Sequence, residues 1–174
     1  TDHFLQFTPG SDVALLNALL NVIVEEEIYD RQYVEANTEG FDDFATHIRN
    51  FSPDKMASLC GIEADELRTV ARKVAKAGAA MIFWGMGIAQ HTHGTDNARC
   101  LIALALICGQ IGRPGTGLHP LRGRNNVQGA SDAGLIPMMY PDYKLVANDE
   151  AKEKFEKYWG TDLSSETGLT VVEI

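Results

Sequence analysis

Apolar residues recur at helical spacing along most of the chain. The run after residue 12 places Val13, Leu16 and Ile23 on one stripe, which predicts a helix over 13–26 with Asp12 as its cap. Further helices are predicted over 30–36, 42–50, 54–60, 63–77, 97–108 and 149–159. The hydrophobic pattern therefore predicts a chain that is mostly helical.

One apolar run departs from the helical period and predicts a strand. Residues 79–84, AAMIFW, are apolar without interruption and lie between glycines, which is typical of a fully buried strand in a parallel sheet. Residues 3–7 and the final run TVVEI also have strand character. Strands that alternate with helices favour an α/β fold that is rich in helices.

The segment Gly109–Gly134 follows the most apolar predicted helix and holds seven of the sixteen glycines. It also carries Arg113, His119, Arg122 and Arg124, whose side chains can donate hydrogen bonds to carboxylate or phosphate oxygens. Long segments without regular structure are usually functional or disordered in compact domains. Composition alone leaves two interpretations open, an ordered functional loop and a solvated surface loop.

The composition is that of a globular protein and argues against two kinds of partner. With 174 residues, 45% of them hydrophobic, the chain can build the core of one domain or of a piece of one. A formal net charge of −9 opposes nucleic-acid binding, which needs a basic face. No run reaches the roughly 18 apolar residues of a membrane span. We expect a soluble single segment, 1–174, that is truncated at both ends.

The cysteines and histidines do not form a metal-binding pattern. Cys60, Cys100 and Cys108 are odd in number and lack a C-x-x-C spacing, so neither a disulfide framework nor a zinc or iron-sulfur ligand set is indicated. His91 and His93 have no third ligand nearby in the sequence and are interpreted as polar loop residues. We predict buried free thiols and assign no metal ligand.

Two turns lie where an α/β protein can bind a nucleotide. The turn 8–11, TPGS, precedes Asp12, and Gly85-Met86-Gly87 follows the AAMIFW run; both would lie at the ends of strands. A plain strand-to-helix turn is the alternative interpretation of the first. In the second, Gln90 replaces the third glycine of G-x-G-x-x-G, so a NAD-type fingerprint is rejected.

Several runs resemble, in the same order, the large catalytic subunit of molybdenum- or tungsten-dependent formate dehydrogenases. They are TPGSDVALLNALL, FWGMGIAQHTHGTDNARCLIALALICGQ, GQIGRPGTGLHPLRGRNNVQGASDAGLIPMMYPDY and KYWGTDLSSETGLTVVEI. The R-G-x-N-N-V-Q-G-A run is long and specific, and the chain is most similar to the cytoplasmic NAD-linked members. The resemblance implies a helix-rich α/β part of a Rossmann-like layered domain of the molybdopterin oxidoreductase fold.

The resemblance also implies roles for individual residues. Arg122 matches the arginine that lies beside the metal and orients formate, which makes it the candidate catalytic residue. The cofactor-binding candidates, which match other motifs of the family, are Gly10, Asp12, Met86, Gly87, Gln90, Gly123 and Arg124. Gly10 and Asp12 match the turn at the guanosine part of the cofactor. Family members often have glutamine where this chain has Arg124, so this arginine is expected to meet a phosphate or pterin oxygen.

By this resemblance, the parent protein oxidises formate to carbon dioxide at a molybdenum or tungsten bis-molybdopterin guanine dinucleotide centre. Electrons would leave through Fe-S clusters to other subunits, linked to flavin and NAD, in the cytoplasm. The cysteines that hold the cluster, and the cysteine or selenocysteine that binds the metal, belong to upstream sequence that this chain lacks. The isolated segment is therefore expected to be inactive.

The sequence leaves three alternatives open. Another molybdopterin oxidoreductase, similar to nitrate reductases, would act on a different small substrate, although the R-G-x-N-N-V-Q-G-A run favours formate. A non-catalytic module would bind the guanine dinucleotide without turnover. A purely structural fragment would have loops that become disordered once they are separated from their partners.

Overall fold

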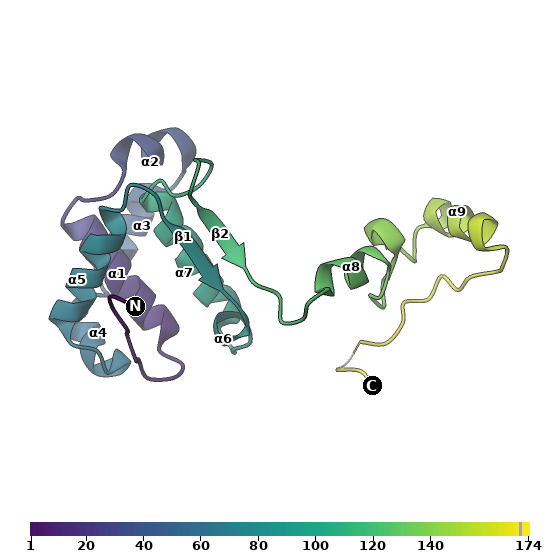
Figure 1. Ribbon diagram of the computed structural model, residues 1–174, viewed down its shortest axis with the longest axis horizontal. Helices are drawn as coiled ribbons and strands as arrows, with labels where there is room; N and C mark the ends of the chain where they lie inside the picture. Colours follow the sequence, from purple (N-terminus) through teal and green to yellow (C-terminus); the bar gives the residue numbers. More distant parts are fainter. Residues whose placement is uncertain (171) are drawn as a thin grey trace. The chain divides into compact units, whose positions relative to one another are not determined.

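The computed structural model describes residues 1–170 and 172–174. The chain divides into two compact units, Thr1–Leu121 and Arg122–Ile174, which follow each other along the ribbon of Figure 1. Each unit has its own cluster of buried hydrophobic residues. The first unit holds most of the helices.

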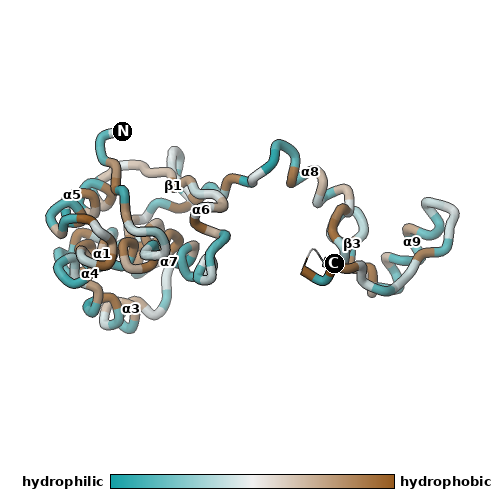
Figure 2. Tube along the Cα trace, turned by 90° about the horizontal axis from the view of Figure 1, so that it is seen from below, coloured by the Kyte–Doolittle hydropathy of each residue, from teal (hydrophilic) through white to brown (hydrophobic). Residues whose placement is uncertain are grey.

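The first unit consists of helices packed around α1, with a pair of strands beside them (Figure 1). Its elements are α1 (Asp12–Glu25), α2 (Arg31–Asn37), α3 (Phe41–Ile48), α4 (Pro53–Cys60), α5 (Ala64–Ala75), β1 (Met81–Trp84), α6 (Met86–Ala89), α7 (Gly94–Ile107) and β2 (Gly117–Pro120). α1 contacts α3, α4, α5 and α7. Figure 2 shows apolar residues concentrated among these helices.

The core of the first unit centres on α1, where every residue from Leu15 to Val24 is buried. Leu20 on α1, Ile48 on α3 and Leu67 on α5 are each at most 1% exposed. The buried amides of Asn21 and Asn97 are both hydrogen-bonded, as expected from the cost of burying them alone. The Nδ2 of Asn21, for example, donates to the carbonyl of Ile48 at 3.1 Å, which ties α1 to the end of α3.

β1 and β2 are parallel, with Met81 opposite Gly117 and Trp84 opposite Pro120. This confirms the predicted strand and its parallel pairing. The prediction that the strand is fully buried is wrong, because Met81 and Phe83 are 50% and 56% exposed. Within the described residues, the hydrophobic core packs against the alternate positions of β1, including Trp84, and leaves the other face of the strand open.

A buried glutamine joins the segment after α7 to the start of β1. Gln110 is 2% exposed, and its Oε1 accepts from the N–H of Ala80 at 3.0 Å while its Nε2 donates to the carbonyl of Ala77 at 3.0 Å. The Nε of Arg113 donates to the carbonyl of Gly109 at 2.7 Å. These bonds place the chain that leads into β2 beside β1.

The short helix α6 rests closely on α7. A Cβ added at Gly94 would lie 2.0 Å from the carbonyl oxygen of Ala89, so this approach requires glycine. Asn97 is 2% exposed, and its Nδ2 donates to the carbonyl of Ile88 at 2.9 Å. α7 thereby holds α6 at the carboxyl end of β1.

The second unit is built around a small aromatic cluster. Its elements are α8 (Val127–Asp132), β3 (Met139–Tyr140), the 3-10 helix η1 (Pro141–Tyr143), β4 (Lys144–Leu145) and α9 (Asp149–Trp159). β3 and β4 pair antiparallel. Tyr140, Val146, Ala151 and Phe155 are buried together, and the rings of Tyr140 and Phe155 lie 5.1 Å apart.

The predicted loop Gly109–Gly134 is interrupted by β2 and α8, so the prediction of a continuous loop is wrong. Residues 137–143 also contain regular elements, β3 and η1. Neither β2, GLHP, nor α8, VQGASD, has an apolar period. Both form because neighbouring segments fix them, which local sequence patterns do not reveal.

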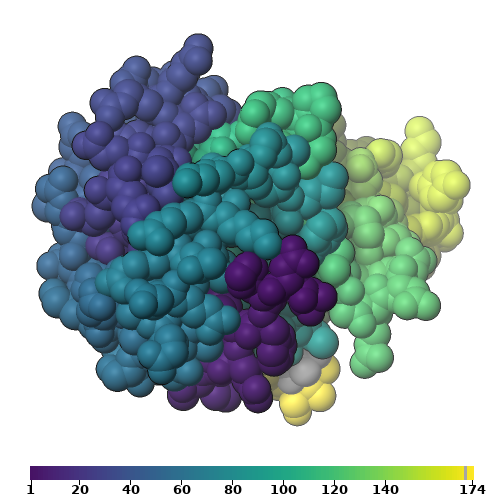
Figure 3. Space-filling view, turned by 60° about the vertical axis from the view of Figure 1, so that its left-hand side comes forward, coloured from purple at the N-terminus to yellow at the C-terminus, as the bar shows by residue number. Residues whose placement is uncertain are grey.

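The strands predicted at the two ends of the sequence do not form in the described residues. Residues 3–7 lack strand pairing, and residues 170 and 172–174 form coil and turn, while Val171 lies outside the described residues. Apolar character alone does not make a strand, since a ladder needs a hydrogen-bonded neighbour. The N-terminal residues instead lie on the surface of the first unit (Figure 3), where Asp2 pairs with Lys73 at 2.9 Å.

The predicted helices are all present, with shifts of a few residues at their ends. α9 has its predicted bounds. Asp12 is the first residue of α1 and Ser11 is its cap, so the assignment of Asp12 as the cap is wrong by one position. α7 begins at Gly94, before the predicted start at residue 97. In the described parts of the chain, no helix is both long and apolar enough to cross a membrane.

Gly94→Ala tests the close contact between α6 and α7. The new methyl group would overlap the backbone at Ala89, so we expect the free energy of unfolding to fall by about 1–3 kcal/mol. Urea unfolding followed by circular dichroism measures this change. Gly78→Ala is the matched control, because an added Cβ there has no neighbour within 4 Å among the described residues. Equal stability of the two variants would contradict the close contact between α6 and α7.

Candidate functional site

Three of the predicted residues, Met86, Gly87 and Gln90, lie together at the carboxyl end of β1. Met86 is 54% exposed, and Gln90 is exposed directly after α6. A Cβ added at Gly87 would meet no atom within 4 Å in the described chain. The short segment 86–90, which comprises α6 and Gln90, therefore offers an open backbone and an exposed amide, which suit close approach to a heterocyclic ligand.

Two residues that the sequence interpretation missed hold this turn in place. Gly94 allows α6 to approach α7, and Asn97 binds the carbonyl of Ile88 from inside the first turn of α7. The sequence contains a signal for both, because Gly94 and Asn97 lie at the start of a helix whose later residues are mostly apolar. His91 adds a contact of 2.7 Å between its Nε2 and the carbonyl of Gly87.

The turn 8–11 leads into α1 and is fastened to α4. The N–H of Thr8 donates to the carbonyl of Cys60 at 2.8 Å, and the Oγ of Ser11 donates to the carbonyl of Thr8 at 2.6 Å. Gly10 has a φ of 86° and open space around its missing Cβ in the described chain. Gly10 can thus face a ligand, whereas Asp12 is only 3% exposed.

The burial of Asp12 changes what its carboxylate can do. Asp12 lies in the first turn of α1, where a negative charge interacts favourably with the free N–H groups of the helix. A side chain that is 3% exposed presents little surface to a ligand. The structure therefore adds a structural role, support of the start of α1, to the predicted contact with guanosine.

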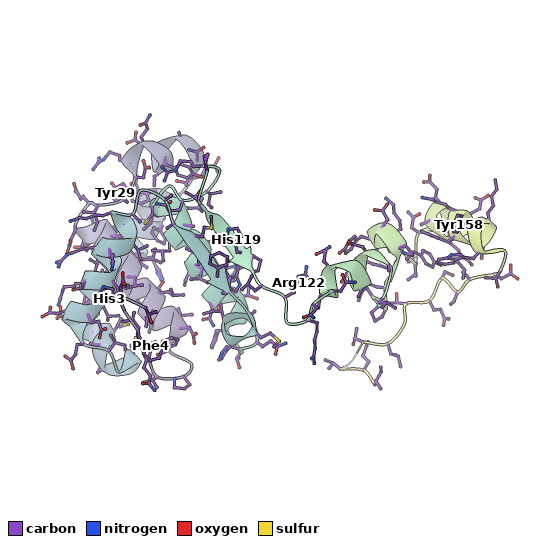
Figure 4. The ribbon with its side chains drawn as sticks, in the orientation of Figure 1. His3, Phe4, Tyr29, His119, Arg122 and Tyr158 are labelled. Carbon is purple, nitrogen blue, oxygen red and sulfur yellow. The ribbon has the colours of Figure 1, made fainter. Side chains whose placement is uncertain are left out.

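The candidates Arg122, Gly123 and Arg124 begin the second unit and precede α8, whereas the other five belong to the first unit. All three are exposed, and Figure 4 shows Arg122 on the segment that leads into α8. The Nη2 of Arg122 donates to the Oε1 of Gln128 at 3.3 Å. An exposed guanidinium with free donors can bind a carboxylate or a phosphate in a bidentate manner.

His119 on β2 carries the one buried side-chain nitrogen or oxygen that lacks a hydrogen-bond partner among the described residues, its Nε2. Its ring stacks on that of Phe83, with centroids 4.8 Å apart and planes at 19°. Figure 4 labels His119 on its strand. In the sequence, His119 is only one of several polar residues in the segment Gly109–Gly134.

The three cysteines are free thiols, and the predicted burial holds for two of them. Cys60 and Cys108 are buried, and Cys100 is half-buried. Burial raises the pKa of the Cys108 thiol to about 12, and the nearby charge of Asp30 adds to this effect. Burial also raises the pKa of Cys60 and of Cys100. These thiols stay protonated near neutral pH, whereas a metal ligand or a nucleophile must be a thiolate.

The polar groups on the turns fit the organic part of a metal-pterin cofactor. In the part of the chain that the structure describes, no group of three or more His, Cys, Asp or Glu residues could hold a metal ion. The exposed groups are instead guanidinium donors, an amide and open glycine backbone, which match phosphate oxygens and heterocycle edges. Asp12 fits less well because of its burial.

Comparison with known proteins gives matches along nearly the whole chain. Residues 1–167 match the family model for molybdopterin oxidoreductases. The chain is 41% identical over 174 residues to the F420-dependent formate dehydrogenase subunit alpha of Methanocaldococcus jannaschii, covering 100% of this chain and 26% of that protein. It is 40% identical over 174 residues to formate dehydrogenase H of Escherichia coli, covering 99% of this chain and 24% of that protein. The chain thus spans about a quarter of the length of these curated relatives.

A solved structure supports the fold. Acetylene hydratase from Pelobacter acetylenicus superposes with a TM-score of 0.64 and 28% sequence identity, covering 66% of this chain and 16% of that chain. The sequence and structural matches agree, and the predicted resemblance to formate dehydrogenase alpha subunits is confirmed. The chain belongs to the molybdopterin oxidoreductase family.

Proposed function

We propose that the chain is an internal segment of the catalytic alpha subunit of a formate dehydrogenase. The observation that carries the proposal is the exposed Arg122 within R-G-x-N-N-V-Q-G-A, in a chain that is about 40% identical to formate dehydrogenases along its length. The segment would contribute part of the binding site for a molybdenum or tungsten bis-molybdopterin guanine dinucleotide. The metal centre, when bound, supplies the oxidation of formate to carbon dioxide.

Arg122 is the residue that we assign to the substrate. Formate is a small carboxylate, and a planar guanidinium binds both oxygens of a carboxylate while keeping its charge at any physiological pH. Holding the two oxygens fixes the direction of the C–H bond, and such orientation can supply a large share of the rate. The exposure of Arg122 supports this assignment, because an exposed guanidinium is accessible to a small ligand.

The remaining candidates would bind the cofactor. The open backbone of Gly87 and the exposed Met86 and Gln90 would border the pterin, and Gln90 can hydrogen-bond a heterocycle edge. Gly123 and Arg124 would follow Arg122 along the cofactor, where Arg124 would meet a phosphate or pterin oxygen. In the turn 8–11, Gly10 would face the guanosine. Asp12, the first residue of α1, would support that turn and contribute a carboxylate.

The wider assembly follows from the same assignment. We infer that the parent subunit contains the metal ligand and an Fe-S cluster in other parts of its sequence, that its domain has Rossmann-like layering, and that the protein is cytoplasmic. Electrons would pass to NAD through other Fe-S and flavin subunits. The name of the Methanocaldococcus jannaschii relative favours coenzyme F420 as the second candidate for the acceptor.

Assays of the purified complex with NAD and with coenzyme F420 decide which of the two is the electron acceptor. Formate-dependent reduction of NAD without reduction of F420 supports NAD as the acceptor. Reduction of F420 without reduction of NAD contradicts this assignment and supports F420.

Arg122→Ala in the full-length, cofactor-loaded protein tests the central assignment. We expect kcat/KM for formate to fall by about 100-fold or more, because oriented charge stabilisation is lost, while metal content stays near that of the wild type. Arg122→Lys keeps the charge but lacks the planar pair of N–H donors of a guanidinium. This variant should therefore retain only part of the wild-type activity. Wild-type turnover in Arg122→Ala would refute the role.

Asp12→Ala and Asp12→Asn separate the structural role of this carboxylate from its cofactor role. If the carboxylate binds the cofactor, we expect both variants to lose metal and pterin, with activity falling in proportion. Both variants should also lower the free energy of unfolding by roughly 1 kcal/mol, since charge at the start of α1 is lost. Unchanged pterin content in both variants would remove Asp12 from the cofactor site.

The non-catalytic binding module is the remaining functional alternative. It predicts that the complete gene product retains pterin and metal yet does not oxidise formate with any acceptor. Turnover that is lost in Arg122→Ala contradicts this alternative.

A further inference from the structure

We propose that Gln128 is a positioning residue for Arg122, and that Gln128, Asp132 and Tyr143 together hold the guanidinium ready for a small carboxylate. This inference rests on the proposed function, because it takes Arg122 as the group that binds formate. All four residues belong to the second unit.

The side-chain amide of Gln128 has hydrogen bonds at both of its ends. Its Nε2 donates to Oδ1 of Asp132 at 2.8 Å and lies 2.8 Å from the Oη of Tyr143. Its Oε1 accepts from the Nη2 of Arg122 at 3.3 Å. Gln128 therefore links the arginine to two groups that are themselves fixed to α8 and η1.

Asp132 determines which end of the amide faces Arg122. An ionised carboxylate accepts hydrogen bonds and donates none, whereas a guanidinium only donates. Turning the amide over would bring Oε1 against the carboxylate of Asp132 and Nε2 against Arg122, which replaces two attractive contacts with two repulsive ones. The observed orientation is thus the one that satisfies both charged neighbours of Gln128.

The turn that carries Tyr143 has an unusual backbone. Asp142 and Tyr143 have φ angles of 62° and 55°, in the left-handed region that residues other than glycine rarely adopt. Gly134, at φ 85°, lets the end of α8 approach this turn, since an added Cβ would lie 2.7 Å from the nitrogen of Pro141. Such conformations persist where the surroundings impose them and concentrate at functional sites. Here the turn brings a phenolic oxygen to Gln128.

The hydrogen bond that Arg122 donates to Gln128 uses one of its five N–H donors and leaves the others for a ligand. An unrestrained arginine side chain must lose rotamer freedom when it binds, and restraint in advance removes part of that cost. The expected benefit is tighter and better oriented formate binding. Retention of the metal and pterin does not depend on it.

Steady-state kinetics of Gln128→Ala in the full-length, cofactor-loaded protein test the proposal. We expect KM for formate to rise by about tenfold, because misplacing a positioned group weakens productive binding, with kcat changed less and metal and pterin content unchanged. Tyr143→Phe removes only the hydroxyl group and should raise KM in the same direction by a smaller factor. Gln32→Ala is the matched control, an exposed glutamine on α2, and should leave both constants at wild-type values.

Protection of Arg122 from phenylglyoxal supplies a readout that needs no turnover. Labelling of Arg122, measured by peptide mass spectrometry at increasing formate, gives the concentration for half protection. We expect this concentration to rise about tenfold in Gln128→Ala, in step with KM. In an Arg122→Lys background, Gln128→Ala should raise KM for formate little further, since the effects of two residues that act through each other are not additive.

Three results would overturn the positioning role. The first is wild-type KM and half-protection values in both Gln128→Ala and Tyr143→Phe while Arg122→Ala has lost activity; the proposed function would then stand without it. The second is a loss of metal and pterin in Gln128→Ala that accounts for its whole defect, which indicates a structural role. The third is wild-type turnover in Arg122→Ala, which removes the proposed function and the positioning role together.

Discussion

The burial of α1 is the constraint on which the first unit depends. Because α1 is buried from Leu15 to Val24 and contacts α3, α4, α5 and α7, the helices around it have little freedom to move. The turn at 8–11 enters α1, and α7 carries α6 and leads through Gln110 to β2. The candidate cofactor residues of this unit therefore lie on short turns held by buried helices, which is the arrangement that a rigid binding surface requires.

Helices were predictable because their signal is local. The apolar period places α1 and α9 within about one residue at each end, and the parallel pairing of β1 also followed from its continuous apolar run. What packs on a strand is not local, so the exposure of Met81 and Phe83 was missed. The same reason explains α8, whose small and polar residues form a helix without an apolar period.

Different parts of the candidate site came from different kinds of evidence. The motifs of the family pointed to Arg122 and to the turn at Gly87, and neither composition nor spacing could have assigned their roles. Geometry then added residues that no motif suggested, namely Gly94 and Asn97 beneath α6. The burial of Asp12 also changes the role expected of this residue, since it adds a structural role at the start of α1.

Fold alone does not determine the reaction, since one solved structure that superposes on this chain is an acetylene hydratase and one fold can host several chemistries. The claim of formate oxidation rests on Arg122 and its setting. The most direct test is to purify the complete gene product, measure its metal and released pterin, and assay formate oxidation. We expect molybdenum or tungsten with the pterin content of a bis-pterin centre, together with formate-dependent electron transfer. A complete protein that contains neither metal nor pterin, or that is loaded and leaves formate untouched, would contradict it.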